Sequence, residues 1–259
     1  AFTGLLNETY GSGAEAAYST RRLNGNVTDC MVIRRASDST TTTIGFDGSG
    51  NIDEAAINTF CTGTTCTVYQ WLDQSGNGNT ATAAAPANEP TIYTGGALVK
   101  ENGKVAVDNQ GGTQELQLTS SLTGMETIIA VAKQDNGATN GYLIGASGDN
   151  SLRSQSGWRA ITGSPAPNSS DFYFNGSIYI DGVSLTSNLT TSNQILIAAN
   201  SATGGYNYAL EFIGGTYPSR HWDGPIQELI IYGNDKSSVR TSIEENVGDY
   251  FTQNTPLLD

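Results

Sequence analysis

The sequence predicts an all-β protein, a sandwich of short strands with a few short helices. The chain holds 31 Gly among its 259 residues and is rich in Thr, Ser and Asn, which suits many tight turns. Short apolar segments alternate with these turn clusters along the whole chain, as in β-sandwiches. A hydrophobic fraction of 37% is enough for such a core, because a strand with one solvent-facing side needs apolar residues only at alternate positions.

The first half of the chain is expected to contain two helices among its strands. Good helix formers predict a helix at 14–23. Asp53 is expected to cap a second helix that runs to Phe60, with Glu54 in its first turn, where the helix dipole favours a negative charge. A hairpin turn is expected at 101–104, which reads Glu-Asn-Gly-Lys. The strands expected here are 31–35, 40–46, 68–72, 90–93, 98–100, 105–107 and 115–118.

The second half is expected to contain the central strand and a C-terminal helix. Residues 125–133 are apolar enough for a strand that is buried on both faces. Ser237 or Ser238 is expected to cap a helix that runs to about Phe251 and has one apolar face. No internal repeat or Pro/Ser-rich linker is visible, so we expect one domain at 1–252 and a tail at 253–259. Further strands are expected at 142–146, 172–183, 194–199, 208–214 and 226–232.

The charge and the apolar pattern of the chain each oppose one class of partner. A net charge of −13 opposes nucleic-acid binding, which needs Lys and Arg to neutralise phosphates. No run of 18 apolar residues is present, so no insertion into a membrane is expected. The basic residues gather in one cluster, which we expect either to pair with carboxylates of the chain or to meet an acidic neighbour; its members are Arg21, Arg22, Arg34 and Arg35.

The cysteines predict one disulfide. Cys61 and Cys66 bracket a Thr/Gly turn, and a bridge between them would close it with Gly63 inside. Zinc is not expected, because the chain has one His and no second Cys pair. A disulfide indicates an oxidising, extracellular location. Cys30 is expected to be a small buried apolar residue.

Few single residues indicate a ligand. Asp73 is a weak calcium candidate because Asn and backbone oxygens surround it, but a turn shaped by its side chain is the favoured interpretation. No cofactor is otherwise expected. Asp108 and Asp149, each followed by Asn, are equally ambiguous. The aromatic residues that lie beside turn signals are candidates to bind a glycan: Tyr206, Tyr217 and Trp222.

Segments in the second half carry a resemblance to a known superfamily. Residues 222–232 and the helix after them resemble the closing strand and helix of laminin-G-like, concanavalin A-like jelly rolls. Residues 178–183, Ile-Tyr-Ile-Asp-Gly-Val, resemble a hairpin strand of those domains. The resemblance implies a concanavalin A-like jelly-roll β-sandwich of two antiparallel sheets.

A second resemblance covers residues 16–80. The segments 16–23, 37–44, 60–66 and 73–79 look like the first third of the catalytic domain of fungal family-54 α-L-arabinofuranosidases. The same block also resembles domains of phage tail and other virion proteins.

The catalytic carboxylates that the arabinofuranosidase resemblance implies are not at the matching positions. The family's acid/base Asp follows a Gly-Gly pair, where this chain has Gly214-Gly215-Thr216. The nucleophile Glu follows a Gly/Trp segment, but residues 157–164 contain no carboxylate. Glu211 and Asp223 lie near the first position and leave a rearranged pair open.

These observations predict a non-catalytic protein of a phage virion surface: a head decoration, tail or fibre component. It would pack against other virion proteins, as a homo-oligomer or within a larger assembly, and would attach to a host-cell glycan. Two alternatives stay open. One is a secreted carbohydrate-binding module, and the other is a divergent arabinofuranosidase-like glycoside hydrolase.

Overall fold

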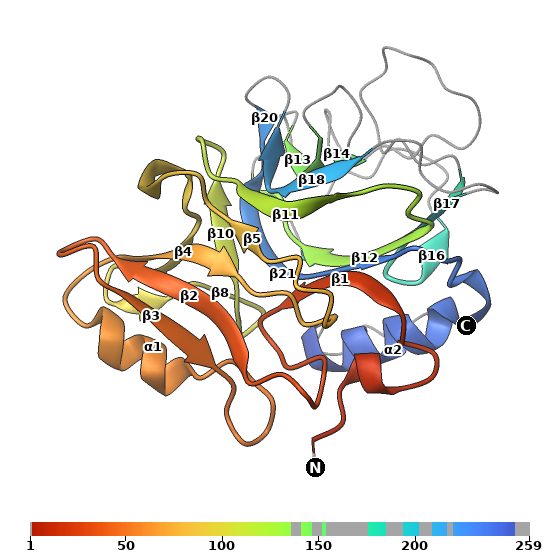
Figure 1. The fold of residues 1–259 in the computed structure, drawn as a ribbon, viewed down its shortest axis with the longest axis horizontal. Helices are drawn as coiled ribbons and strands as arrows, with labels where there is room; N and C mark the ends of the chain where they lie inside the picture. The colour runs from red at the N-terminus through yellow and green to blue at the C-terminus, as the bar shows by residue number, and fades with distance from the viewer. Residues whose placement is uncertain are drawn as a thin grey trace.

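The chain folds as a jelly-roll β-sandwich with a few short helices, which confirms the fold class (Figure 1). The structure, a computed structural model, describes residues 2–135, 141–146, 152–153, 176–184, 194–201, 209–216 and 220–251. Within these residues the strand pairings are antiparallel except for a parallel one between Tyr142 and His221. None of the helices in the same residues has the length and apolar character needed to cross a bilayer.

The strands of the first half of the chain are short. They are β1 (Ala14–Ser19), β2 (Asp29–Arg35), β3 (Thr41–Gly45), β4 (Cys66–Trp71), β5 (Ala81–Thr82), β6 (Thr91–Thr94), β7 (Ala97–Leu98), β8 (Lys100–Glu101), β9 (Lys104–Val105), β10 (Val107–Gln110) and β11 (Leu116–Leu122).

The strands that follow complete the sandwich. They are β12 (Thr127–Ala132), β13 (Tyr142–Gly145), β14 (Leu152–Arg153), β15 (Gly176–Ile180), β16 (Val183–Ser184), β17 (Ile195–Ser201), β18 (Leu210–Ile213), β19 (Gly215–Thr216), β20 (Arg220–His221) and β21 (Asp223–Tyr232). The α-helices are α1 (Glu54–Cys61) and α2 (Arg240–Phe251), and the 3-10 helices are η1 (Leu5–Asn7), η2 (Pro86–Asn88) and η3 (Ser237–Val239).

Two layers of strands form the sandwich. The first layer runs in the order β16-β15-β17-β12-β21, and β1 and β10 pair with successive parts of the other edge of β21. The second layer runs in the order β3-β2-β4-β5-β11-β18-β13-β14. Strand β6 pairs with both β4 and β10, so hydrogen bonds continue from one layer to the other.

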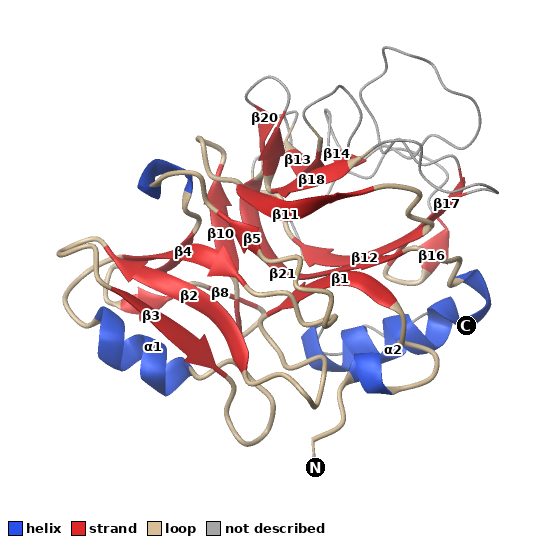
Figure 2. Ribbon diagram, in the orientation of Figure 1, coloured by secondary structure: helices blue, strands red, loops and turns tan. Residues whose placement is uncertain are grey.

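Strand β12 of the first layer is buried on both faces, as the apolar pattern of 125–133 predicts. Ile128 and Ala130 of β12 face the core between the layers, while Ile129 and Val131 face the opposite side. Helix α2 covers that opposite side, and Figure 2 shows it lying along the layer that contains β1 and β12. The buried residues of α2 are Ile243, Glu244, Val247 and Phe251.

Local sequence signals fix several elements where they were expected. Asp53 accepts a hydrogen bond from Ala56 N at 2.9 Å and caps α1. Asn102 and Gly103 turn the β8–β9 hairpin with φ of 46° and 76°, the positive values that an Asn-Gly turn provides at little cost. Strands β15 and β16 form a hairpin around Asp181-Gly182, whereas residues 172–175 lie outside the described residues.

The helix predicted at 14–23 is wrong, because Ala14–Ser19 form strand β1 and residues 20–23 are not helical either. Residues Ala16 to Ser19 pair with Ile231 to Glu228 of the closing strand β21. These four residues of β1 are buried, and a helix would not keep this pairing. Helix propensity differs among residues by only about 0.7 kcal/mol each, so burial between a sheet and its neighbours outweighs it.

The cysteines follow the expected arrangement. Cys61, the last residue of α1, and Cys66, the first residue of β4, form a disulfide. Cys30 is a free and fully buried thiol on β2, and burial raises its pKa far above the usual value. A thiol with a raised pKa holds its proton and is a poor nucleophile.

Candidate functional site

The Asp73 loop is a structural element. The carboxylate of Asp73 accepts hydrogen bonds from Ala17 N and Ser75 N on Oδ1, at 2.9 Å each, and from Ser75 Oγ and Asn79 N on Oδ2. These four bonds use the lone pairs that a calcium ion would need. No group of three His, Cys, Asp or Glu side chains gathers as metal ligands anywhere in the described residues.

The predicted glycan-binding aromatics do not form one surface. Trp222 is fully buried between the two layers, and its indole Nε1 donates to Lys133 O at 3.1 Å. Its selection as a sugar contact is therefore wrong, because a buried ring offers no face for stacking. Tyr206 and Tyr217 lie outside the described residues.

A carboxylate and an imidazole meet beside the Gly214-Gly215 pair. Glu115 comes just before β11, and His221 lies on β20 opposite Gly215 of β19. His221 Nε2 lies 3.4 Å from Glu115 Oε2, with side-chain exposures of 8% and 21%. A Cβ atom at Gly215 would approach Glu115 Oε2 to 2.6 Å and His221 Cδ2 to 2.7 Å. Glycine at position 215 therefore allows both side chains to pack against the backbone.

Asp223 lies close to His221 in the sequence, and its carboxyl group has a raised pKa. It starts β21 two residues after His221, and the intervening Trp222 points into the core. Because side chains of extended backbone alternate, His221 and Asp223 share the opposite side. Burial, and next the charge of Asp135, raise the pKa of Asp223 above its usual value.

Further acidic side chains surround Asp223. Burial and the charges of Asp135 and Asp223 raise the pKa of Asp108 on β10. Lys133 offsets part of this repulsion, with its Nζ 3.0 Å from Asp135 Oδ1 and 3.2 Å from Glu101 Oε2. The site thus combines carboxyl groups that hold protons more firmly than usual with one compensating ammonium group.

Asp223 and Glu115 flank one short segment. A Cβ at Gly111 would lie 2.9 Å from Asp223 Cγ, so Asp223 packs on the start of this segment, and Glu115 stands at its end. Asn109 Nδ2 donates to Gln114 O at 2.9 Å and to Gly214 O at 3.4 Å, which ties the segment to the Gly214-Gly215 pair. One end of the sandwich, near β20 in Figure 1, therefore carries two carboxyl groups and an imidazole.

The sequence singled out part of this site. Asp223 was one of the two carboxylates selected near the Gly-Gly pair. The other, Glu211 on β18, accepts a hydrogen bond from Ser121 Oγ at 3.1 Å. Glu115 and His221 were missed, because no local motif marks them and the pairing of β19 with β20 brings them together.

The arginine cluster pairs mostly with carboxylates of the chain, one of the two outcomes expected from the sequence. Arg22 instead donates to Asn24 O and Gly25 O, at 3.3 and 2.7 Å. Glu228 and Tyr232 of β21 are structural, since Glu228 pairs with Arg21 and Tyr232 Oη donates to Gly11 O at 3.0 Å. The ion pairs are Arg21 with Glu228, Arg34 with Glu89 and Arg35 with Asp38.

Comparison with known sequences points to one enzyme family. A family profile described as "Alpha-L-arabinofuranosidase B, catalytic" matches residues 7–111. Alpha-L-arabinofuranosidase B of Emericella nidulans is 40% identical over 117 residues, which cover 38% of this chain and 22% of the relative. Alpha-L-arabinofuranosidase B of Aspergillus kawachii is 46% identical over 74 residues, or 27% of this chain and 15% of the relative. The matched segments therefore span about a fifth of these relatives' length.

Comparison with solved structures extends the likeness of the fold. The chain resembles an arabinofuranosidase that was crystallised in complex with arabinofuranosyl-α-1,2-xylobiose, with a TM-score of 0.58 and 22% identity. The alignment covers 95% of this chain and 64% of that one. The fold of the arabinofuranosidase thus continues well past residue 111.

These findings correct the functional prediction. The family profile and the relatives are arabinofuranosidases, which are enzymes, so the prediction of a non-catalytic phage virion protein is wrong. The predictions of virion partners and of a location on the virion surface are wrong for the same reason. The sequence resemblance to arabinofuranosidases is supported and extends over 7–111 rather than 16–80.

Proposed function

We propose that this chain is a glycoside hydrolase of the α-L-arabinofuranosidase type, acting on arabinofuranosyl groups of glycans. The observation that carries the proposal is the match of residues 7–111 to an arabinofuranosidase catalytic-domain profile. A common fold over 95% of the chain is compatible with it. The carboxyl groups beside Gly214-Gly215 supply the chemistry that the reaction needs.

Hydrolysis of a glycosidic bond needs a carboxylic acid that protonates the leaving oxygen and a carboxylate on the other side of the scissile bond. We assign the acid to Asp223, because burial and the charge of Asp135 raise its pKa and so favour the protonated form. Glu115 is the second carboxylate, and His221 holds its side chain beside Gly215. This pair replaces the carboxylates absent at Thr216 and in 157–164.

The rest of the proposal follows from this chemistry. A pair of carboxyl groups needs no metal or cofactor for hydrolysis. Tyr206 and Tyr217 remain proposed sugar contacts, since Tyr217 follows the Gly-Gly pair by two positions in the sequence. We propose that one domain spans 1–252 with a tail at 253–259, and that the protein works outside the cell, where the Cys61–Cys66 disulfide persists.

An aryl α-L-arabinofuranoside assay tests the proposal. Wild-type protein should release the aryl group, and Asp223→Asn and Glu115→Gln should each lower kcat by about 10²–10⁴-fold, the usual range for losing a general acid or base. Glu245→Gln removes an exposed carboxylate of α2 and is the matched control, with unchanged kcat. The proposal fails if the folded wild type releases no aryl group between pH 4 and 7, or if both active-site variants retain full activity.

The stereochemistry of the product shows which role Glu115 has in the reaction. Retaining enzymes hold their carboxyl groups about 5–5.5 Å apart and inverting enzymes about 6.5–9.5 Å apart. NMR of the first product anomer shows which class applies. A retaining reaction makes Glu115 the nucleophile, whereas an inverting reaction makes it the base that activates water.

A further inference from the structure

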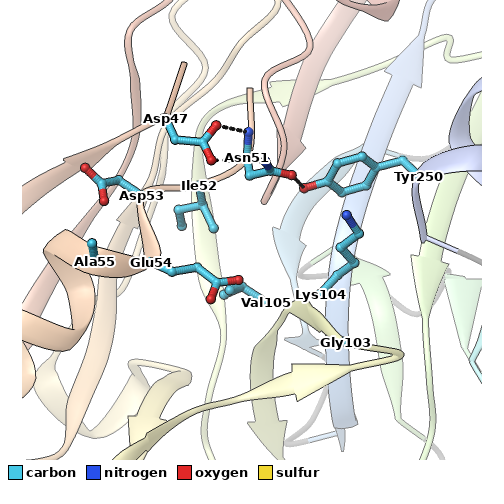
Figure 3. Close-up of a pocket in the computed structure, with 10 residues that line it drawn as sticks. All are labelled: Asp47, Asn51, Ile52, Asp53, Glu54, Ala55, Gly103, Lys104, Val105 and Tyr250. Atoms are coloured by element: carbon cyan, nitrogen blue, oxygen red, sulfur yellow. Dashed lines mark hydrogen bonds between the residues drawn. The ribbon is translucent and has the colours of Figure 1, made fainter. Parts of the chain in front are cut away.

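A cavity of about 420 Å³ lies between the start of helix α1, the β8–β9 hairpin and the end of helix α2 (Figure 3). Its volume falls in the range of roughly 300–1,000 Å³ found for small-molecule sites. The polar residues that line it are Asp47, Asn51, Asp53, Glu54, Lys104 and Tyr250.

The walls of this cavity are held in place by hydrogen bonds of their own. Tyr250 Oη donates to Asn51 Oδ1 at 2.8 Å, which joins α2 to the turn before α1. Asn51 in turn donates to Asp47 through its backbone N at 2.9 Å and its Nδ2 at 3.0 Å. Asp53 Oδ1 is occupied by its cap on Ala56 N. The lining is therefore formed before any ligand arrives.

Three polar atoms of the lining have no hydrogen bond or ion pair with the described residues. Glu54 uses Oε2 for an ion pair with Lys100 at 2.7 Å, and Asp53 uses Oδ1 for the helix cap. Within the part of the chain that the structure describes, no hydrogen bond or ion pair reaches Glu54 Oε1, Asp53 Oδ2 or Lys104 Nζ. Lys104 Nζ lies 4.0 Å from the centre of the Tyr250 ring, and Figure 3 shows it on the side of the cavity opposite Asp53.

We infer that this cavity binds a neutral, polyhydroxylated ligand: a sugar unit. A cationic ligand would meet the Lys104 ammonium group, and an anionic ligand would meet three carboxylates. Hydroxyl groups both donate and accept, so one sugar ring can donate to Asp53 and Glu54 while it accepts from Lys104.

The Tyr250 ring holds Lys104 in place and does not stack on the ligand. Lys104 Nζ and the Arg21 guanidinium, 5.3 Å from the ring centre, both lie over the ring. A sugar is therefore recognised by hydrogen bonds to the carboxylates and the ammonium group. The site goes beyond the proposed function, because its lining contains none of the residues Asp223, Glu115 and His221.

Titration calorimetry with D-xylose, L-arabinose and xylobiose tests the inference. Lys104→Met keeps the aliphatic stem and removes the ammonium group, and Asp53→Asn keeps the helix cap, because Asn caps as well as Asp. Each should weaken sugar binding by about tenfold or more, the effect of about 1.4 kcal/mol from one lost charged hydrogen bond. Arg35→Met removes a cation that, like its partner Asp38, lies outside the lining, and this variant should bind as the wild type does.

The outcomes separate this inference from the proposed function. The binding is measured with the Glu115→Gln protein as well as the wild type, so that turnover does not enter the heat signal. Sugar binding that Lys104→Met and Asp53→Asn weaken supports the cavity even if no aryl arabinofuranoside is cleaved. No sugar binding, binding that both variants leave unchanged, or binding of 1,4-diaminobutane in place of every sugar would overturn it.

Discussion

Arg21 and Glu228 form a buried ion pair that joins the end of β1 to the closing strand β21. Arg21 Nε lies 2.8 Å from Glu228 Oε2, and Nη2 lies 3.0 Å from Oε1, so the contact is bidentate. Ser19 Oγ also donates to Oε2 at 2.7 Å, and Arg21 Nη1 donates to Asn246 Oδ1 of α2 at 2.8 Å. One guanidinium group therefore links a strand of each half of the chain to the C-terminal helix.

Removing one partner of this pair should destabilise the fold strongly. Arg21→Met leaves the Glu228 carboxylate buried with an exposed fraction of 0% and without its counter-charge. The expected loss is about 3–5 kcal/mol in the free energy of unfolding, measured by urea denaturation. Arg35→Met breaks an exposed pair with Asp38 and should cost less than about 1 kcal/mol. Equal losses in the two variants would contradict a structural role for the buried pair.

The charge of Asp135 should set the alkaline limb of the activity profile. Its carboxylate raises the pKa of Asp223, second to burial. Asp135→Asn removes a negative neighbour and so favours ionised Asp223, which lowers the pKa of the acid. The alkaline limb of kcat/KM should therefore move to lower pH, because Asp223 loses its proton earlier. Asp249→Asn, an exposed carboxylate of α2, should leave the limb in place; an unmoved limb in Asp135→Asn would remove Asp223 from the role of acid.

Asp108 should destabilise the fold at neutral pH. Its pKa is raised by burial and by the charges of Asp135 and Asp223, so the folded state binds the proton more tightly than the unfolded state. The stabilisation that this gives is present below the unfolded pKa and is lost as pH rises through the folded pKa. Asp108→Asn should raise Tm at pH 7 by about 2 °C, a change of under about 1 kcal/mol, and the gain should shrink toward pH 3. A gain that is constant with pH would contradict this account.

Position 215 should tolerate no side chain without a loss of activity. The Cβ of Gly215→Ala would approach Glu115 Oε2 to 2.6 Å and must displace it together with His221. We expect kcat on an aryl arabinofuranoside to fall by about 10²-fold, since displacement by about 1 Å has that effect. Gly48→Ala is the matched control, because a Cβ there has no atom within 4 Å. Full activity of Gly215→Ala would show that the packing of Glu115 and His221 is not needed.

The Cys61–Cys66 disulfide should contribute modest stability. The bridge closes a loop with a sequence separation of 5, for which loop-closure entropy gives about 2 kcal/mol. The double variant Cys61→Ala/Cys66→Ala should unfold at lower urea concentration than the wild type. Wild-type protein in a thiol reductant should match the variant, because Cys30 is buried and unpaired. A wild type that reductant leaves unchanged would contradict the contribution.

The sequence by itself determined the helix cap, the hairpin turn and the central strand. The Asp53 cap, the Asn102-Gly103 turn and the apolar run of β12 lie where residue types alone place them, because each depends on neighbours a few residues away. Residues 7–111 also identified the family that the chain resembles. The sequence by itself led to the wrong prediction of a virion protein, because the carboxylates that the arabinofuranosidase resemblance implies are absent at Thr216 and in 157–164.

The tertiary structure decided everything that depends on distant strands. Ala14–Ser19 has helical propensity but forms strand β1, because it pairs with the buried strand β21. The two strands are more than 200 residues apart in the sequence, so no local signal predicts this pairing. In the same way, β19 and β20 bring His221 to Glu115, and β21 places Asp223 on the same side. Burial and long-range pairing outweigh local preference by several kcal/mol per element, so a single sequence determines the class of fold, and the assembled sheet determines which carboxyl groups meet.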